Sequence, residues 1–319
     1  MTALPIIIDC DPGIDDAIAI LTAFVSPELE LLGITAVCGN QPLERTVRNT
    51  LQLCELGGRT DVPVFAGCFR PLLREPIHGQ FHGGSGLGNT VLPDPVKAAE
   101  GRHAVDFLIE SCRAAAANNR KVTLCTLGPL TNVAVALRMA PAIAEGIERI
   151  VMMGGAYREA GNRTMAAEFN MLADPHAAHI VFAAGLPIVA LPLDATHQVI
   201  LTPQHAAQLS GAAGRISGPL GEMMAFWDRN DVRRYGARGG PLHDPLVIAY
   251  LLAPHLFGTE TARVFVEHDS ELCLGQTIAD WYGKSGQHPN VEIVTRVDAQ
   301  EVFDLFHERL SRYAPEALT

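Results

Sequence analysis

Leu4-Pro-Ile-Ile-Ile-Asp9-Cys-Asp11-Pro-Gly-Ile-Asp15-Asp16, near the start of this 319-residue chain, joins an apolar run directly to a group of acids. The run Leu4–Asp9 predicts a buried strand, because strands covered on both faces are apolar throughout. Asp15–Val25 predicts a helix, since acidic residues in its first turn complement the helix macrodipole. A buried strand followed at once by a helix is typical of βαβ units, so the stretch predicts a parallel sheet.

The same alternation of apolar runs and helical patterns continues through the first two thirds of the chain. Further strands are expected at Leu31–Val37, Val62–Phe65, Val122–Thr126, Arg149–Met153 and Pro187–Leu191. Further helices are expected at Leu43–Leu56, Gly101–Asn118, Leu130–Leu137 and Pro175–Ala184. The sequence therefore predicts an α/β fold, a single Rossmann-like domain over residues 1–319 with a mostly parallel central sheet flanked by helices.

The last third is less regular. Helices are expected at Gln204–Leu209, Leu220–Arg233, Leu242–Leu252 and Asp298–Tyr313, and edge strands at Ala262–Val266 and Val291–Val297. Two long glycine-containing loops, Ala66–Pro95 and Gly154–Asp174, interrupt the earlier pattern. Long loops in a compact domain are usually functional or mobile.

Composition excludes several classes of partner. The net charge is −11, from 24 Lys and Arg against 35 Asp and Glu, whereas nucleic-acid and anionic-membrane surfaces are basic. No apolar run reaches the length of a membrane span, and the N-terminus lacks a signal-peptide pattern. The seven Cys form no C-x-x-C pair, which indicates reduced thiols and a cytoplasmic protein. We expect no nucleic-acid or membrane partner.

Asp9, Asp11, Asp15 and Asp16 place four carboxylates within eight residues, at the end of a strand and the start of a helix. Carboxylates this close repel one another and have raised pKa values unless a cation neutralises them. Oxygen ligands favour Ca²⁺ or Mg²⁺ over zinc. The alternative interpretation is an acidic helix cap and turn with its charge in solvent.

Other segments carry candidate groups, each with a structural alternative. His243-Asp244-Pro245 precedes an apolar helix, where the acid alone would serve as an N-terminal charge and the histidine as a structural residue. Gly128-Pro-Leu-Thr-Asn132 ends a strand and starts a helix, and the Leu127 carbonyl at this break could face a metal.

Two glycine-containing segments also carry candidate functional groups. The segment Met153–Asp174 is dense in amides and carboxylates that suit vicinal hydroxyls, with an Asn/Gly turn and an Asp174 helix cap as the alternative. His82-Gly-Gly-x-Gly-Leu-Gly88 lacks the lysine of a P-loop, so a flap that carries His82 is the better functional interpretation than a phosphate cradle.

Together these motifs closely resemble the inosine–uridine-preferring nucleoside hydrolase family. The D-x-D-P-G-x-D-D, G-P-L-T-N, M-G-G, G-N…A-E-F-N…D-P and H-D-P segments occur in family order, from Ile6 to about Leu252. The resemblance implies the nucleoside hydrolase fold, hydrolysis of the N-glycosidic bond of a ribonucleoside, and a homodimer or homotetramer.

The resemblance also implies roles for individual residues. The Ca²⁺ ligands would be Asp11, Asp16, Asp244 and the Leu127 carbonyl, with Asp11 also the general base for the attacking water. Asp9 would support the site from behind. Groups that hold the ribose would be Asp15, Asn40, Met153, Asn162, Glu168 and Asn170.

Base preference rests on residues near the leaving base. His82, His243 and Tyr235 resemble the pyrimidine-preferring branch, in which such residues pass a proton to the base. Trp227 and Asp231 stand where that branch has small polar and amide side chains, and Trp227 either stacks on a base or packs as a core or interface aromatic. A preference for uridine or cytidine is expected, with broad purine and pyrimidine specificity as the alternative.

Two functions from other classes compete with this hypothesis. A haloacid-dehalogenase-like phosphatase shares the Asp9-x-Asp11 pair after an apolar strand, but that class has Thr or Val where Gly13 stands here. A catalytically silent nucleoside-binding protein would keep the ligand residues without turnover.

Overall fold

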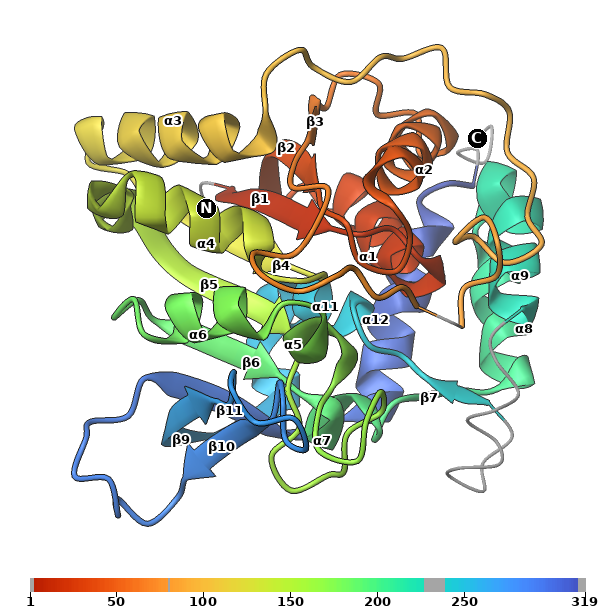
Figure 1. The fold of residues 1–319 in the computed structure, drawn as a ribbon. Helices are drawn as coiled ribbons and strands as arrows, with labels where there is room; N and C mark the ends of the chain where they lie inside the picture. Colours follow the sequence, from red (N-terminus) through yellow and green to blue (C-terminus); the bar gives the residue numbers. More distant parts are fainter. Residues whose placement is uncertain (1–2, 80, 227–238, 315–319) are drawn as a thin grey trace.

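A nine-stranded sheet forms the centre of the computed structural model, which describes residues 3–79, 81–226 and 239–314 (Figure 1). The strand order is β10-β9-β11-β6-β5-β4-β1-β2-β3. The strands from β11 to β3 pair in parallel, whereas β9 is antiparallel to β11 and β10 is antiparallel to β9. The bounds are β1 Leu4–Cys10, β2 Leu29–Ala36, β3 Val64–Ala66, β4 Val122–Thr126, β5 Ile147–Met153, β6 Ile188–Leu191, β9 Phe257–Val266, β10 Thr277–Asp280 and β11 Val291–Val297. A separate small pair is β7 Ile200–Leu201 and β8 Gly240–Pro241.

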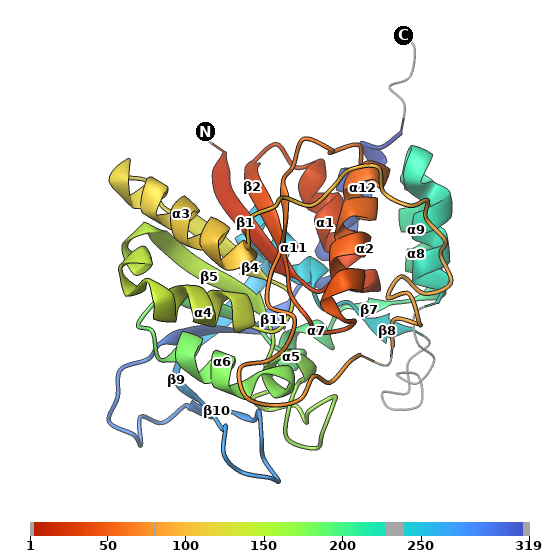
Figure 2. The same cartoon turned by 45° about the horizontal axis from the view of Figure 1, so that its top comes forward.

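Helices cover both faces of the sheet (Figures 1 and 2). One layer contains α1 Ile14–Phe24, α2 Leu43–Leu56, α8 Pro203–Ala212, α9 Ser217–Ala225, α11 Pro245–Leu252 and α12 Ala299–Ser311. The other contains α3 Ala104–Ala117, α4 Thr131–Met139 and α6 Pro175–Phe182. The short helices α5 Phe169–Ala173 and α7 Leu193–Thr196 follow β5 and β6, and 3-10 turns lie at Pro141–Gly146, Gly214–Ile216 and Pro254–Leu256.

Strand β1 shows why the sheet must be covered on both sides. Ile6 and Ile8 belong to the core under α1 and α11, whereas Ile7 belongs to the core under α3 and α4. All three side chains are fully buried. Because successive strand residues face opposite sides, an uninterrupted apolar run is stable only between two helix layers.

The order of the strands creates a switch point beside β1. The chain runs from β1 to β2 and β3 on one side, and then returns to place β4, β5 and β6 on the other. In open parallel sheets the loops diverge at such a point, and ligands bind outside the carboxyl ends of the strands there. Asp11 follows β1 and Leu127 follows β4, so the topology brings both segments to this crevice.

The predicted α/β architecture with a mostly parallel sheet is confirmed, and the elements of the first two thirds lie within a few residues of their expected bounds. Strands were expected at Ala262–Val266 and Val291–Val297 and are present, but their expected placement at an edge of the sheet is wrong. β11 lies between β6 and β9, and β9 extends back to Phe257 and lies between β11 and β10. The edge is β10, which we did not expect, and its pairing with β9 is what places β9 inside the sheet.

Three further differences concern helices. α11 begins at Pro245 rather than Leu242, because β8 and the His243–Asp244 turn occupy the preceding residues. α9 ends at Ala225, and the rest of the expected helix Leu220–Arg233 falls mostly outside the described residues. Short helices α5 and α7 were not expected. In the described part of the chain, no helix has the length and apolarity to cross a membrane.

Candidate metal and substrate site

Asp11 lies in the crevice between β1 and β4 and is fully buried. Its Oδ2 accepts a hydrogen bond of 2.6 Å from the Asn40 backbone N–H. A Cβ at Gly39 would lie 2.0 Å from that oxygen, and a Cβ at Gly128 would lie 2.4 Å from Oδ1. The two glycines therefore let the backbone approach the carboxylate closely from both sides. Oδ1 has no hydrogen-bond partner among the described residues and is the oxygen left for a ligand.

Asp15, Asp16 and Asp244 form the acidic cluster beside Asp11. One carboxylate oxygen from each of the three lies within 4.8 Å of the others, which makes them the group found among the described residues that could hold a metal. Asp16 also accepts backbone hydrogen bonds from Gly13 at 2.8 Å and Asp11 at 3.3 Å, which fixes its carboxylate at the turn. The Asp244 side chain makes no capping hydrogen bond to α11, and its carboxyl group instead lies beside that of Asp16.

The electrostatic state of this cluster is unfavourable without a cation. Burial and the neighbouring carboxylates raise the pKa of Asp11 and of Asp244 well above the usual range of an aspartate. Burial, with repulsion from Asp15, raises the pKa of Asp16 to about 6. Among the described residues no Lys or Arg forms an ion pair with any of these groups, and the one cationic side chain within ion-pair distance is His82, with Nδ1 3.8 Å from Asp15 Oδ1. The oxygen donors present thus fit a hard divalent cation.

The Leu127 carbonyl lies at the end of β4, directly beside β1, since the Leu127 backbone N–H donates to the Asp9 carbonyl at 2.8 Å. Asn170 Nδ2 donates to the Leu127 carbonyl at 2.7 Å and to the Met153 carbonyl at 3.2 Å. One amide group from α5 thereby joins the ends of β4 and β5. A carbonyl oxygen has two lone pairs, so the Leu127 oxygen keeps one for a cation.

Glu168 and Asn162 shape the turn that presents Asn170. The Glu168 carboxylate caps α5, accepting hydrogen bonds from the backbone N–H groups of Asn170, Met171 and Gly155 at 2.9, 3.2 and 3.1 Å. Burial raises the pKa of Glu168 to about 7 despite these donors. Asn162 Oδ1 accepts from the Phe169 backbone N–H at 3.0 Å. The structure thus brings these predicted ribose residues together with Met153.

The two histidines approach the acids from different segments. His82 Nδ1 accepts a hydrogen bond of 3.1 Å from the Ile14 backbone N–H, so the glycine-rich loop is held against the start of α1. His243 Nδ1 lies 2.8 Å from Thr196 Oγ1. Burial lowers the pKa of His243 to about 4, and the nearby charge of Asp15 opposes that shift.

Asp9 was expected to support the site from behind, but sequence reasoning missed the residues that hold Asp9 in place. Asp9 Oδ2 accepts from Thr35 Oγ1 at 2.5 Å and from Asn132 Nδ2 at 2.8 Å, and burial raises the pKa of Asp9 to about 7. Asn132 Oδ1 in turn accepts from the Cys68 backbone N–H at 2.8 Å, which ties the long loop to β1. Asn132 was visible in its motif, whereas nothing around Thr35 distinguished it from a strand residue.

Asp174 is a helix cap, which was the structural alternative to a role in binding hydroxyl groups. One oxygen caps α6 through the Ala177 N–H at 3.0 Å, and the other accepts from Thr131 Oγ1 and the Leu72 N–H at 2.8 and 2.9 Å. Three of the expected residues, Trp227, Asp231 and Tyr235, lie outside the described residues.

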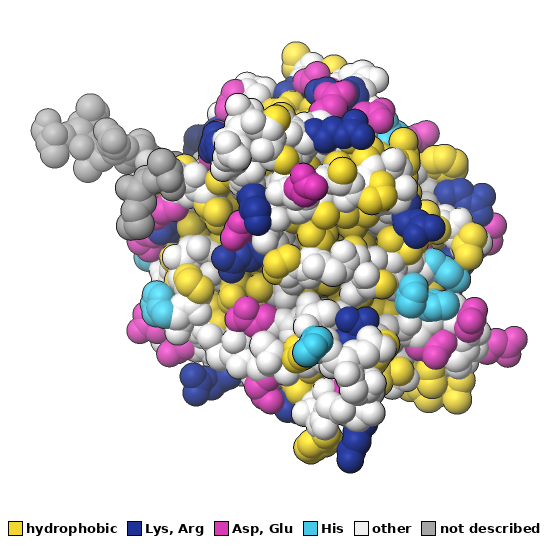
Figure 3. Space-filling view, turned by 90° about the vertical axis from the view of Figure 1, so that its left-hand side faces the viewer, with side chains coloured by type: hydrophobic (Ala, Val, Ile, Leu, Met, Phe, Trp, Pro, Cys, Tyr) yellow, Lys and Arg dark blue, Asp and Glu magenta, His cyan; other side chains and the backbone are white. Residues whose placement is uncertain are grey.

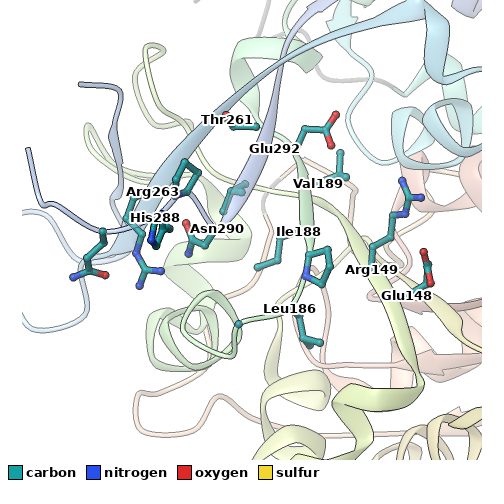
Figure 4. Close-up of a pocket in the computed structure, with 15 residues that line it drawn as sticks. Glu148, Arg149, Leu186, Ile188, Val189, Thr261, Arg263, His288, Asn290 and Glu292 are labelled. Carbon is teal, nitrogen blue, oxygen red and sulfur yellow. The ribbon is translucent and has the colours of Figure 1, made fainter. Parts of the chain in front are cut away.

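A second hollow lies at the opposite, amino ends of β5, β6 and β11 (Figure 4). Arg149, Arg263 and His288 line it together with Glu148 and Glu292, and these charged groups lie apart along the wall. Arg149 and Glu148 are at one end of the view and Arg263 and His288 are at the other. On the face shown in Figure 3, basic, acidic and apolar side chains are intermixed over the surface. The buried acids at the carboxyl ends therefore form the stronger candidate site.

Comparison with known proteins agrees with this placement. The sequence pattern of the inosine-uridine preferring nucleoside hydrolases matches residues 6–304. An uncharacterized protein of Schizosaccharomyces pombe is 44% identical over 97% of this chain and 99% of its own length. The pyrimidine-specific ribonucleoside hydrolase RihA of Shigella flexneri is 42% identical over 98% of this chain and 100% of its own.

A solved structure, the purine-preferring ribonucleoside hydrolase from Gardnerella vaginalis, superposes with a TM-score of 0.89 at 33% identity, covering 97% of this chain and 98% of that one. Matches over nearly the whole length confirm the expected fold and enzyme class and leave no support for a phosphatase. The chain belongs to the inosine-uridine preferring nucleoside hydrolase family.

Proposed function

We propose that this chain hydrolyses ribonucleosides to free base and ribose at a Ca²⁺ site between β1 and β4, with a preference for pyrimidine nucleosides. The observation that carries the metal site is the buried group Asp11, Asp15, Asp16 and Asp244, which has no Lys or Arg partner among the described residues. Buried carboxylates at this spacing require a compensating cation to stay ionised.

The residues proposed to hold Ca²⁺ are Asp11, Asp16, Asp244 and the Leu127 carbonyl. Asp11 has a buried oxygen without a partner, and Asp16 and Asp244 belong to the converging group. Ca²⁺ accepts six to eight oxygen ligands, so substrate hydroxyls and water can complete the shell. When bound, the ion supplies charge neutralisation and lowers the pKa of a coordinated water.

The ribose is proposed to lie over this cluster. Asp15 has a buried Oδ1 without a hydrogen-bond partner among the described residues, which suits a ribose hydroxyl donor. Asn40 lies beside Asp11, to which its backbone N–H donates, and its side-chain amide is a proposed partner of a ribose hydroxyl. Asn162, Glu168 and Asn170 are proposed to hold the 5′ side of the sugar, with Met153 packed beneath them.

The reaction follows from the charges around the sugar. Asp11 accepts a proton from the water that attacks C1′, and direct attack by one water inverts that carbon. The ribosyl group develops positive charge as the C1′–N bond breaks, and the surrounding carboxylates stabilise it. His243, His82 and Tyr235 are proposed to donate hydrogen bonds and a proton to the leaving base, so that it departs as a neutral molecule.

Support for pyrimidine preference is the 42% identity to the pyrimidine-specific RihA over nearly the full length of both chains. The two histidines near Asp15 agree with this preference, and Trp227 and Asp231 are proposed base contacts. We also propose a cytoplasmic location, supported by seven cysteines that are all free, and a homodimer or homotetramer.

Base release from a panel of nucleosides tests the proposed reaction. We expect turnover of uridine and cytidine above inosine, adenosine and guanosine, and losses of roughly 10⁴-fold for the 2′-deoxy counterparts, because Asp15 would lose its hydroxyl partner. Release is measured by chromatography with Ca²⁺ present. Tight nucleoside binding without any release would instead establish a silent binding protein.

Replacement of Asp11 by asparagine tests the general base. The amide keeps the shape of the side chain but cannot accept a proton, so kcat should fall about 10²- to 10⁴-fold. The matched control is Asp94→Asn, at an exposed side chain paired with Arg48, which should leave kcat unchanged. An Asp11→Asn enzyme with kcat near wild type would show that another group activates the water.

Replacement of His243 by alanine tests assistance to the leaving group. Natural nucleosides should lose about 10²-fold or more in kcat, because their bases leave poorly without a proton. p-Nitrophenyl riboside, whose leaving group needs no proton, should change by no more than about threefold, since it draws nothing from an acid. Equal losses on both substrates would rule out this role.

The raised carboxyl pKa values predict how pH affects the metal-free protein. Asp16 and Asp9 titrate near 6 and 7 when folded, against about 4 when unfolded. Between the unfolded and folded pKa values, the folded state binds more protons than the unfolded state. The free energy of unfolding therefore falls as pH rises through this range. The lowered pKa of His243 makes the free energy of unfolding rise with pH below pH 6.5. This is the effect of one group, and it opposes the effect of the carboxyl groups.

Thermal unfolding with EDTA, and separately with Ca²⁺, measures this effect. We expect the increase in Tm on adding Ca²⁺ to be larger at pH 8 than at pH 5, because ionised carboxylates gain most from the cation. An increase that shrinks toward pH 8 would contradict the assignment of the cluster as the metal site.

A further inference from the structure

Thr196 makes a part-buried contact with His243 that neither the motifs nor the proposed reaction explains. Its Oγ1 lies 2.8 Å from His243 Nδ1, and Thr196 is fully buried. The two residues are 47 positions apart in the chain. Thr196 ends the short helix α7 after β6, whereas His243 precedes α11. This hydrogen bond thus joins side chains from two separate segments at the carboxyl side of the sheet.

The backbone on each side of the contact is fixed by its own hydrogen bonds. In α7 the Thr196 N–H donates to the Pro192 carbonyl at 3.0 Å. The Asp194 carboxylate accepts from the backbone N–H groups of Tyr157 and Arg158 at 2.9 and 2.7 Å, which holds α7 against the segment after β5. On the other side, the Leu242 N–H donates to the Val199 carbonyl at 2.8 Å. The threonine hydroxyl is therefore presented from a rigid support.

The contact determines which ring nitrogen of His243 can meet the substrate. Nδ1 is occupied by the threonine, so Nε2 is the nitrogen left for the base. His243 directly precedes Asp244, a member of the acidic cluster. The charge of Asp15 acts on the ring, and His197 and His82 are its other titratable neighbours. The ring centroids of His197 and His243 are 6.0 Å apart in an edge arrangement.

We propose that Thr196 is a positioning residue for His243, keeping Nε2 directed at the leaving base before and after proton transfer. A hydroxyl both donates and accepts hydrogen bonds. It accepts from Nδ1–H when the ring is protonated, and it keeps this hydrogen bond when Nε2 gives its proton to the base, because the neutral ring left behind retains its proton on Nδ1. The ring therefore needs no reorientation when its proton moves to the base. This inference rests on the leaving-group role proposed above for His243.

Paired substitutions of Thr196 test the proposal. Thr196→Val keeps the branched shape and removes the hydroxyl, whereas Thr196→Ser keeps the hydroxyl. For Thr196→Val we expect kcat on uridine to fall about 10- to 100-fold, part of the full value of an acid catalyst, with p-nitrophenyl riboside within about threefold of wild type. Thr196→Ser should keep uridine turnover within about threefold, since the hydrogen bond remains.

The matched control is Thr123→Val in β4. Thr123 is also buried, and its hydroxyl has no hydrogen-bond partner in the described structure. Removal of a buried hydroxyl alone should leave unchanged the ratio of kcat on uridine to kcat on p-nitrophenyl riboside. In a His243→Ala background, Thr196→Val should cause no further change in that ratio, because residues that act as one unit are not additive.

Each alternative outcome has a separate meaning. If Thr196→Val and Thr196→Ser both lower kcat equally on the two substrates, Thr196 is a packing residue and the proposal is overturned. If His243→Ala is selective for uridine but Thr196→Val is not, the proposal fails while the role of His243 stands. If His243→Ala itself shows no selectivity, the proposed function of His243 has failed first, and the contact serves only structure.

Discussion

Repulsion among buried carboxylates is the constraint around which this structure is arranged. Asp15, Asp16 and Asp244 are buried with their carboxylates close together, and the buried Asp11 lies beside them. Without a cation, protons must occupy some of these groups, as their raised pKa values indicate. Glycines at positions 39 and 128 bring the backbone close to the Asp11 carboxylate on both sides.

The sheet provides the rigid support that such a site needs. The acids follow β1, the Leu127 carbonyl follows β4, and the strand order diverges between these two strands. Side chains from neighbouring elements then fix the groups in place. Asn170 holds the Leu127 carbonyl, and Asn132 holds Asp9 together with the long loop after β3. The cost of placing charges together is thus offset by many hydrogen bonds that fix their geometry.

Local sequence predicted the part of the fold that depends on local pattern. Apolar runs and helix patterns up to β6 are continuous, so the parallel sheet and the acids after β1 could be read directly. In the last third β9 and β11 were expected as strands but not in their place within the sheet, because they return to it after a long excursion and carry mixed polar and apolar residues. Which strand lies at an edge depends on pairing across the fold, and the β10 partner of β9 gave no strong signal.

The residues of the candidate site likewise divide into those that local sequence could predict and those that it could not. Residues in dense motifs, such as Asp11 and Glu168, were predictable because several ligand types occur together. Thr35 and Thr196 were not, since a threonine in an apolar segment gives no sign that its hydroxyl meets a charged or ring group across the chain. Their partners are 26 and 47 residues away, and only the folded structure shows the contact.

Calorimetric titration of the EDTA-stripped protein with Ca²⁺ tests the account most directly, with Asp16→Asn and the exposed Asp94→Asn protein measured alongside. The account predicts one saturable site per chain in the wild type and in Asp94→Asn, greatly weakened in Asp16→Asn. A stripped wild-type protein that binds no divalent cation, and still releases base from uridine, would contradict it.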